Sequence, residues 1–193
     1  MHWARFSMPG RAYSGGARST LVFGGARSGK SRFAEDLCLQ SGLERVYLAT
    51  SVPFDAEMTA RVESHKQQRG SGWTTIEEPL DIAGALETHA APGRVILIDC
   101  LTVWLNNLLY EEKDVAAETE RLTQQIPTLQ GPCVFVSNEV GHGIVPENRL
   151  ARAFRDVQGR LNQDIAAACA QVVFVAAGQP VLLKPRKEPE ITL

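Results

Sequence analysis

The sequence predicts an α/β domain built on one mostly parallel β-sheet of about six strands, with helices on both faces of the sheet. Short β-rich apolar runs alternate along the chain with longer segments of helical period, which is the pattern of strands joined by crossover helices. Two of the runs, Arg94–Ile98 and Cys133–Val136, are almost continuously apolar instead of alternating. Strands of that kind are covered on both faces, so we expect these two in the middle of the sheet.

The predicted strands are five clear segments and a weaker sixth near Trp73–Ile76. The clear segments are Thr20–Phe23, Arg45–Ala49, Arg94–Ile98, Cys133–Val136 and Val172–Ala176. The clearest helix runs from about Asn148 to Cys169, where apolar residues from Leu150 onward recur every three or four positions and predict one buried side. The acidic stretch between Glu111 and Gln125 is either an exposed helix or an irregular excursion.

The predicted organisation is a flexible leader (residues 1–19), a single domain (residues 20–184) and a loose tail (residues 185–193). A length of 193 residues with 44% hydrophobic content suits one core. Arginines scattered through the leader argue against a signal peptide. The sequence contains no run of 18 apolar residues, so we predict no membrane span. The four cysteines lack the spacing of a zinc site and fit a reduced cytoplasmic compartment.

Charge is distributed unevenly along the chain, although the formal net charge is only −2. Residues 1–34 contain no acidic residue. The basic residues of that segment are Arg5, Arg11, Arg18, Arg27, Lys30 and Arg32. Because the rest of the chain is acidic, the composition excludes a generally basic nucleic-acid-binding protein.

The strongest motif is a complete G-x-x-x-x-G-K-S directly after a predicted strand and directly before a helical pattern. Its residues are Gly24, Gly25, Ala26, Arg27, Ser28, Gly29, Lys30 and Ser31. Glycines in such a loop let successive backbone N–H groups face phosphate oxygens at the positive end of the next helix. Lys30 would reach the β- and γ-phosphates, and the Ser31 hydroxyl would bind Mg²⁺. The alternative is a glycine-rich turn with a solvated lysine.

An acidic residue near the metal is expected at the end of a neighbouring strand, and Asp99 follows the apolar run Arg94–Ile98. We predict that Asp99 is the carboxylate on the metal side of the site. The alternative is an aspartate that only caps the next helix. The chain has no Asn-Lys-x-Asp guanine-recognition motif, so a regulatory GTPase is disfavoured.

A histidine between two arginines is a candidate nucleophile. Arg61, His65 and Arg69 are successive i,i+4 neighbours of a helix predicted to open at Asp55. Flanking guanidinium groups favour a neutral, nucleophilic imidazole, and the same arginines would hold phosphate oxygens. The alternative is an exposed helix whose histidine is only solvated.

Several motifs in the same order resemble one enzyme family. They are the loop Gly24–Ser31, the segment Tyr47–Ser51, the residues Arg61, Val62, His65 and Lys66, and the segments Asn138–Gly141 and Asn148–Asp156. Together they resemble the bifunctional adenosylcobinamide kinase/adenosylcobinamide-phosphate guanylyltransferase family, over about Thr20 to Lys184. The implied fold is of the P-loop NTPase type.

The resemblance implies two activities. One is NTP-dependent phosphorylation of the aminopropanol hydroxyl of adenosylcobinamide; the other is transfer of GMP from GTP to the resulting adenosylcobinamide phosphate, with release of pyrophosphate. Family members carry the guanylyl group on a histidine, and the matching residue is His65. The implied substrates are GTP, ATP and the cobinamides, and a homo-oligomer is expected. The implied nucleotide contacts beyond the loop are Ala49, Thr50, Ser51, Lys66, Arg69, Glu77 and Asp99, with Glu78 adjoining Glu77.

The segment from Asn138 to Asp156 follows a central strand, where α/β sheets bind ligands, so we expect it to border the site. Alternatively, Arg152 and Asp156 form only an i,i+4 pair. Relatives commonly carry a second histidine where this chain has Ser64, and often glutamate in place of Asp99. Two rival functions remain: a P-loop kinase of another small metabolite, and a non-enzymatic, nucleotide-dependent interaction protein.

Overall fold

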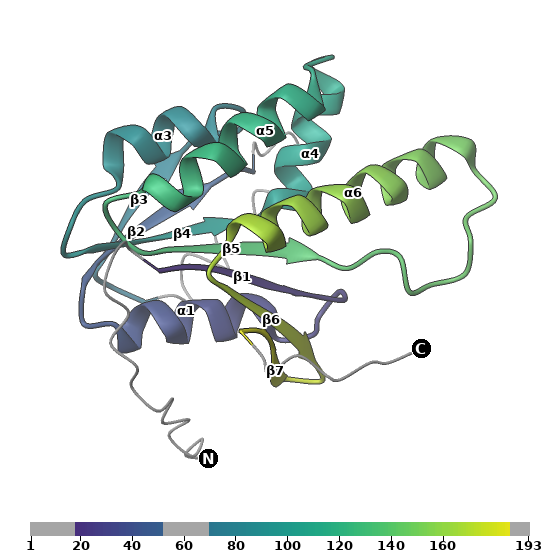
Figure 1. Cartoon of the computed structure of the whole chain (residues 1–193). Helices are drawn as coiled ribbons and strands as arrows, with labels where there is room; N and C mark the ends of the chain where they lie inside the picture. Colours follow the sequence, from purple (N-terminus) through teal and green to yellow (C-terminus); the bar gives the residue numbers. More distant parts are fainter. Residues whose placement is uncertain (1–17, 52–69, 186–193) are drawn as a thin grey trace, which may run out of the picture.

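The chain folds around one β-sheet, shown by a computed structural model that describes residues 18–51 and 70–185 (Figure 1). The strands are β1 (Ser19–Gly24), β2 (Glu44–Ala49), β3 (Trp73–Glu77), β4 (Arg94–Asp99), β5 (Cys133–Asn138), β6 (Gln171–Ala176) and β7 (Gln179–Lys184). The helices are α1 (Lys30–Gln40), α3 (Ile82–His89), α4 (Leu101–Tyr110), α5 (Val115–Gln125), the short 3-10 helix η1 (Ile126–Thr128) and α6 (Arg149–Ala168). Most of the predicted leader, the helix predicted to open at Asp55 and residues 186–193 lie outside the described residues.

Seven strands within the described ranges form the sheet, in the order β3-β2-β4-β5-β1-β6-β7. Neighbours pair in parallel except β6 and β7, which are antiparallel. The six predicted strands are all present. The two continuously apolar runs form β4 and β5, which lie in the interior of the sheet, as their composition predicted.

The strand that the sequence analysis missed is β7, an edge strand with several exposed residues and Pro180 near its start. Proline is tolerated at an edge because no neighbour needs its missing N–H, but it weakens the sequence pattern of a strand. Ala177 and Gly178 connect β6 to β7, and both have positive φ, as a two-residue hairpin turn requires.

Helices cover both faces of the sheet, unequally (Figure 1). Helix α1 covers one face, and α3, α4, α5 and α6 cover the other. The strands divide their side chains accordingly. In β5, Val134 and Val136 belong to the core on the α1 side, whereas Cys133 and Phe135 belong to the larger core on the opposite side. Strand alternation therefore assigns each residue at a strand end to one of the two faces.

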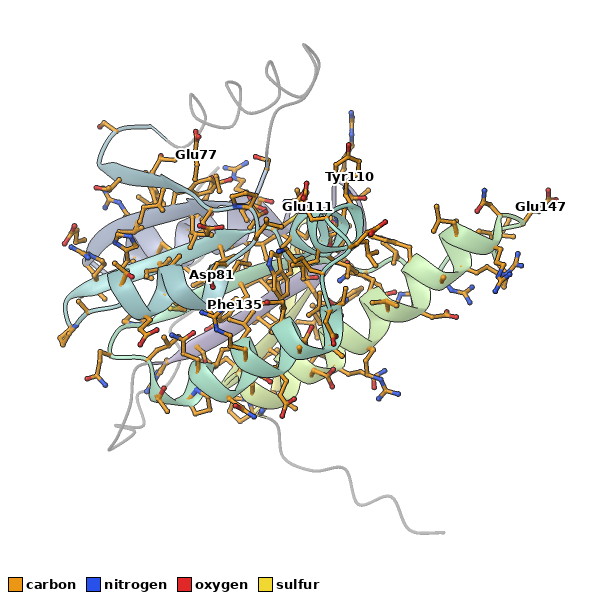
Figure 2. All side chains as sticks on the ribbon, turned by 90° about the horizontal axis from the view of Figure 1, so that it is seen from above. Glu77, Asp81, Tyr110, Glu111, Phe135 and Glu147 are labelled. Atoms are coloured by element: carbon orange, nitrogen blue, oxygen red, sulfur yellow. The ribbon has the colours of Figure 1, made fainter. Side chains whose placement is uncertain are left out.

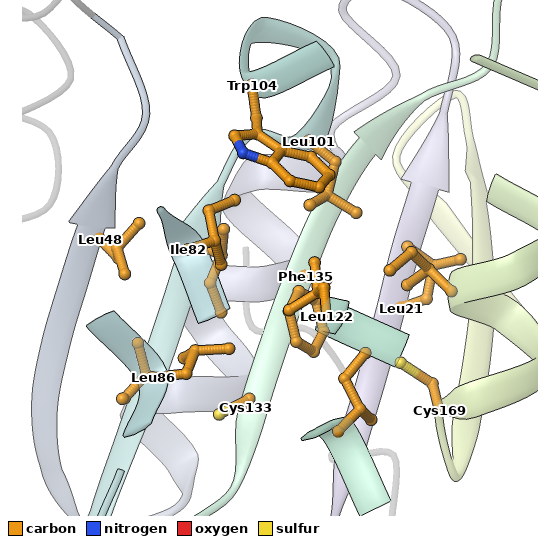
Figure 3. Close-up of a cluster of buried hydrophobic side chains, with 14 of the residues drawn as sticks. Leu21, Leu48, Ile82, Leu86, Leu101, Trp104, Leu122, Cys133, Phe135 and Cys169 are labelled. Carbon is orange, nitrogen blue, oxygen red and sulfur yellow. The ribbon is translucent and has the colours of Figure 1, made fainter. Parts of the chain in front are cut away.

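The larger core centres on fully buried side chains from β4, β5 and the four helices above them (Figure 3). Phe135 is 0% exposed and lies among the labelled leucines and isoleucine of the close-up. Trp104 is buried in the same cluster and donates its indole N–H to the carbonyl of Leu80 over 2.7 Å. That hydrogen bond fixes the loop before α3 against α4.

The acidic stretch from Glu111 to Gln125 contains the helix α5, so the helical alternative is the correct one. Asp114 caps it by accepting hydrogen bonds from the N–H groups of Ala116 and Ala117. Leu122 is fully buried on its inner side. Helix α6 matches its predicted range, with Asn148 as its N-cap.

One residue assigned to the buried side of α6 is not in the core. Leu150 is 76% exposed, because the first turns of α6 extend beyond the sheet (Figure 1). Figure 2 shows Glu147 at the outer tip of the loop that precedes these turns. Helical period alone cannot reveal where a helix outruns the surface that it packs on.

Truncation of Phe135 should strongly destabilise the fold, since the residue is completely buried between the sheet and the helices. We expect Phe135→Ala to lower the free energy of unfolding by about 3–5 kcal/mol, measured by urea denaturation. The matched control Leu150→Ala removes an exposed side chain and should change it by less than about 0.5 kcal/mol. Equal losses in both variants would contradict this description of the core.

The buried thiols predict a loss of stability at alkaline pH. Burial raises the pKa of Cys38 on α1 to about 12 from 9.0, with Glu35 raising it further and Arg45 lowering it. The folded state therefore retains a proton that the unfolded state releases above pH 9. Stability from this thiol is present below pH 9 and falls, by at most about 1.4 kcal/mol per pH unit, as pH rises toward 12. Urea denaturation at pH 8 to 11 should show a shallower decline for Cys38→Ala than for wild type; identical slopes would refute it.

Candidate functional site

The candidate site lies at the carboxyl ends of β2, β4, β5 and β1. Parallel pairing aligns these ends: Gly24 pairs with Asn138, and Ala49 pairs with Asp99. The alternation that places Val22, Val136 and Leu97 in the α1-side core also assigns Gly24, Asn138 and Asp99 to that face. The predicted loop, the predicted carboxylate and the start of α1 therefore meet at one edge of one face.

The glycine-rich loop connects β1 to α1, as predicted. Gly29 is the N-cap of α1 and has a φ of 93°, a left-handed conformation that favours glycine. Ala26, Arg27 and Gly29 are exposed, and Gly25 and Ser31 are half-buried. No acidic residue lies in the first turn of α1. The positive end of the helix thus faces a loop that presents its backbone to solvent.

Lys30 is held within this loop. It is 9% exposed, and its ammonium donates to the carbonyl oxygen of Gly25 over 3.3 Å. The neighbouring Ser28 is buried, and its hydroxyl oxygen has no hydrogen-bond partner among the described residues. The loop therefore combines an exposed backbone, a buried cation and a buried hydroxyl group without a partner. These features form a preformed anion-binding site.

The turn between β6 and β7 supports the loop from its other side. The N–H of Gly178 donates to the carbonyl of Ser28 over 2.7 Å. A Cβ on Gly24 would collide with the carbonyl oxygen of Val175 in β6 and lie 2.8 Å from Ser28 Oγ. β1 and β6 therefore approach so closely that only glycine fits at position 24.

Asp99 ends β4, and the next residue, Cys100, occupies the N-cap position of α4. The Asp99 carboxylate accepts a hydrogen bond from the hydroxyl of Tyr47 over 3.3 Å. Burial raises the pKa of the Cys100 thiol to about 11; Asp99 raises it further, and Lys30 lowers it. Lys30 and Asp99 thus act on the same thiol and lie in the same neighbourhood.

Thr50 connects the ends of β2 and β4. Its side chain is fully buried, and its hydroxyl donates to the carbonyl of Cys100 and accepts from the Cys100 N–H, both over 2.9 Å. Asn107 donates to the carbonyl of Thr50 over 2.7 Å. The hydroxyl of Thr50 is therefore committed to the backbone, whereas the half-buried Ser51 follows it at the same edge.

The structure distinguishes the adjacent carboxylates Glu77 and Glu78. The Glu78 carboxylate accepts hydrogen bonds from the N–H groups of Leu80 and Asp81, over 2.9 and 2.8 Å. Glu77 ends β3 opposite Ala49 and is exposed (Figure 2). The sequence-predicted contact Glu77 thus lies at the site edge, while Glu78 holds the following turn.

The remaining predicted site residues, Arg61, His65, Lys66 and Arg69, lie outside the described residues. The chain leaves the carboxyl end of β2 at Ser51, the last described residue before them. They remain predictions from sequence.

A buried polar network beside the site was not anticipated from the sequence. Ser137 at the end of β5 donates its hydroxyl to the Asn162 carboxamide oxygen over 2.6 Å. Gln158 donates to Ser137 Oγ and to the same Asn162 oxygen, over 3.1 and 3.0 Å. Gln158 and Asn162 are an i,i+4 pair on the otherwise apolar side of α6, which was the available signal.

The segment after β5 contacts the glycine-rich loop at its beginning. The Glu139 N–H donates to the carbonyl of Gly24 over 3.0 Å, next to the loop. Farther along, Arg152 donates to the carbonyls of Pro146 and Glu147, and Asp156 pairs with Arg155 over 2.9 Å. The i,i+4 pair suggested for Arg152 and Asp156 is therefore not formed.

Comparison with known proteins identifies the family of this chain. The family "Cobinamide kinase / cobinamide phosphate guanyltransferase" matches residues 20–183. The chain belongs to this family. Its members are bifunctional enzymes, and the resemblance inferred from the sequence motifs is confirmed.

Curated relatives cover nearly the whole domain. The bifunctional adenosylcobalamin biosynthesis protein CobP of Pseudomonas aeruginosa is 45% identical over 166 residues, which are 85% of this chain and 96% of CobP. Two CobU proteins of the same description, from Escherichia coli and Salmonella typhimurium, are each 42% identical over 179 residues, covering 85% of this chain and 98% of each relative.

Solved structures of more distant proteins share the P-loop NTPase-like fold. The flagellar accessory protein FlaH from Methanocaldococcus jannaschii has a TM-score of 0.50 and 16% identity, over 88% of this chain and 79% of FlaH. The RadB recombinase has the same score and identity, over 83% of this chain and 74% of RadB. At this identity the likeness concerns the fold alone, and it confirms the predicted fold class.

Two further findings concern membrane spans and nucleotide substrates. None of the helices in residues 18–51 and 70–185 combines the length and the apolarity needed to cross a membrane. GTP and ATP are consistent substrates for a family with kinase and guanyltransferase activities.

The close approach of β1 and β6 predicts that Gly24 cannot be replaced by alanine without cost. We expect Gly24→Ala to lower the free energy of unfolding by about 1–3 kcal/mol, because the added methyl group would push the two backbones apart. Gly25→Ala is the matched control, since a Cβ there meets nothing within 4 Å. Urea denaturation of both variants measures the difference, and a stable Gly24→Ala protein would contradict the packing described.

Proposed function

We propose that this chain phosphorylates adenosylcobinamide on its aminopropanol hydroxyl and then transfers GMP from GTP to the phosphate so formed. The proposal is supported by the preformed anion-binding site at Gly24–Ser31, in a chain of the cobinamide kinase / cobinamide phosphate guanyltransferase family. The two reactions attack nucleoside triphosphates at different phosphorus atoms, and each consumes its own nucleotide.

The kinase step uses the γ-phosphate. The hydroxyl oxygen of the substrate attacks the γ-phosphorus, the bond from that phosphorus to the bridging oxygen breaks, and the nucleoside diphosphate leaves. The hydroxyl proton passes to solvent. Lys30 and the loop N–H groups stabilise the negative charge that develops on the phosphate oxygens and on the leaving group. Their positions are set by β1 and α1 before the substrate arrives.

The guanylyl step uses the α-phosphate. An imidazole nitrogen of His65 attacks the α-phosphorus of GTP, and pyrophosphate leaves. A phosphate oxygen of adenosylcobinamide phosphate then attacks the same phosphorus, the bond to the imidazole breaks, and adenosylcobinamide-GDP forms. Arg61 and Arg69 would hold phosphate oxygens, and Lys66, Ser51, Glu77 and the backbone at Ala49 and Thr50 complete the proposed nucleotide contacts.

Mg²⁺ fits the donor set at this edge. The Ser31 hydroxyl and the Asp99 carboxylate are oxygen ligands, which Mg²⁺ prefers, and both are half-buried on the α1 side. When bound, the ion would neutralise charge on the triphosphate. Tyr47, through its hydrogen bond to Asp99, would restrict the orientation of that carboxylate. We further propose a cytoplasmic homo-oligomer.

The experiment that tests the function follows two radioactive labels. Purified protein is incubated with Mg²⁺ and GTP labelled at either the α- or the γ-phosphate, and protein-bound label is measured. We expect an acid-labile, base-stable adduct with the α-label, because a phosphorus–nitrogen bond forms at His65, and its loss in His65→Ala. Wild type that takes up no α-label under any condition would refute the mechanism.

Controls separate this function from its rivals. Cobinamide-dependent consumption of NTP distinguishes the proposed enzyme from a kinase of another metabolite, which would form no α-adduct. A nucleotide-dependent interaction protein would bind GTP without either reaction. Lys30→Ala should impair nucleotide use in all three cases. This variant therefore tests the role of the loop in nucleotide use but does not distinguish the three functions.

A further inference from the structure

We propose that the side-chain amide of Asn138 is a contact for the terminal phosphate of the bound nucleotide, and that a buried polar network orients it. The inference rests on the proposed function only in taking the nucleotide to bind at Gly24–Ser31. It adds a substrate-contacting residue from β5, which the sequence analysis placed only in a segment bordering the site.

The first argument is the position of Asn138. β5 lies between β1, which carries the loop, and β4, which ends at Asp99. Asp99 pairs with Val136, so β5 continues two residues beyond the end of β4, as far as the pairing of Asn138 with Gly24. Strand alternation places Asn138 on the α1 face, with Val134 and Val136. A half-buried carboxamide therefore lies beside the first residue of the loop, on its inner face.

The second argument is that the backbone of Asn138 is held on both of its polar groups. Its N–H donates to Thr102 Oγ1 over 2.9 Å, and its carbonyl accepts from Asn162 Nδ2 over 3.0 Å. Because β4 has already ended, these side chains from α4 and α6 replace the hydrogen bonds that a neighbouring strand would supply. The peptide that carries the Asn138 side chain is thereby fixed.

The third argument is the polarity of the support itself. Ser137 and Gln158 are 0% exposed and Asn162 is 7% exposed, in a position where β5 earlier presents Cys133 and Phe135 to the same side. Apolar side chains would pack this space without unmet hydrogen bonds, whereas Gln158 Oε1 has no partner among the described residues. Such a network costs stability but fixes orientation, which is what a binding residue at a strand end requires.

The γ-phosphate is the part of the nucleotide expected near Asn138. The lysine of this loop motif contacts the β- and γ-phosphates. Helix α1 begins at Lys30 and packs on β1, β4 and β5, while the β6–β7 turn covers the other side of the loop at Ser28 and Gly29. The phosphates near Lys30 therefore lie toward the ends of β4 and β5. An amide donates N–H to a phosphate oxygen without changing the charge of the site, whereas a carboxylate would repel it.

The test compares a triphosphate with a diphosphate. Dissociation constants for the non-hydrolysable β,γ-imido analogue of GTP and for GDP are measured by calorimetry on wild type, Asn138→Ala, Asn138→Asp and the matched control Asn106→Ala, whose residue is exposed on α4. We expect Asn138→Ala to weaken the triphosphate analogue about tenfold to a hundredfold, the loss of one hydrogen bond to a charged group, with GDP changed less than about threefold. Asn138→Asp, of the same shape, should weaken the analogue more.

A positioning variant tests the network separately. Asn162→Ala removes the donor to the Asn138 carbonyl and should reduce the same triphosphate preference, although by less than Asn138→Ala. Thermal unfolding of each variant verifies that it is folded. If Asn138→Ala is not folded, the nucleotide affinities of the same-shape variant Asn138→Asp test the inference. Equal weakening of both nucleotides, or no weakening, would overturn the inference, because a purely structural role would not distinguish a terminal phosphate.

The result is independent of cobinamide chemistry. If wild type binds the triphosphate analogue but neither phosphorylates cobinamide nor takes up the α-label, the proposed function fails while the affinity ratio still decides the role of Asn138. If both activities are present, Asn138→Ala should, at saturating nucleotide, lower kcat for γ-phosphoryl transfer about tenfold or more and leave the rate of α-label uptake within about threefold. Wild type that binds neither nucleotide would overturn both proposals.

Discussion

Pairing of β1 with β5 as far as Gly24 and Asn138 is the constraint on which the candidate site depends. A glycine-rich loop can bind phosphate only if its backbone is held in one conformation, and here the first residue of the loop is still part of the sheet. The Glu139 N–H, which donates to the Gly24 carbonyl, extends the pairing by one more residue. The rigidity of the sheet is thereby transmitted to the loop.

The loop is also held from the opposite side. The carbonyl of Ser28 accepts a hydrogen bond from Gly178 in the β6–β7 turn, so β7 supports the loop although it is itself a partly exposed edge strand. The loop therefore lies between β5 and the β6–β7 hairpin. Preorganisation of this kind lets N–H groups and the Lys30 ammonium stabilise charge without rearrangement during the reaction.

The charged groups at the site are partly withdrawn from water, which strengthens their interaction with an anion. Lys30 is 9% exposed, and Asp99, which accepts a hydrogen bond from Tyr47, is half-buried. A cation and a carboxylate in such a place suit a triphosphate with a bound divalent ion better than a single phosphate. Each proposed reaction then uses a nucleoside triphosphate in this place, with the γ-phosphate toward β4 and β5 for the kinase step and the α-phosphate attacked by the sequence-predicted His65 for guanylyl transfer.

Sequence alone determined the fold class, five strands with clear apolar runs and a weaker sixth, the phosphate loop and the family, because these depend on local patterns: period, apolar run and motif spacing. The tertiary structure decided what depends on contacts between distant residues. It showed that Glu78, unlike Glu77, holds the following turn by a hydrogen bond, and that Cys100 and not Asp99 is the N-cap of α4. It also added β7, whose proline and exposed residues weaken the sequence pattern of a strand. It also joined Thr102, Ser137, Gln158 and Asn162 around the end of β5, since hydrogen bonds between residues up to 36 positions apart leave no local trace in the sequence.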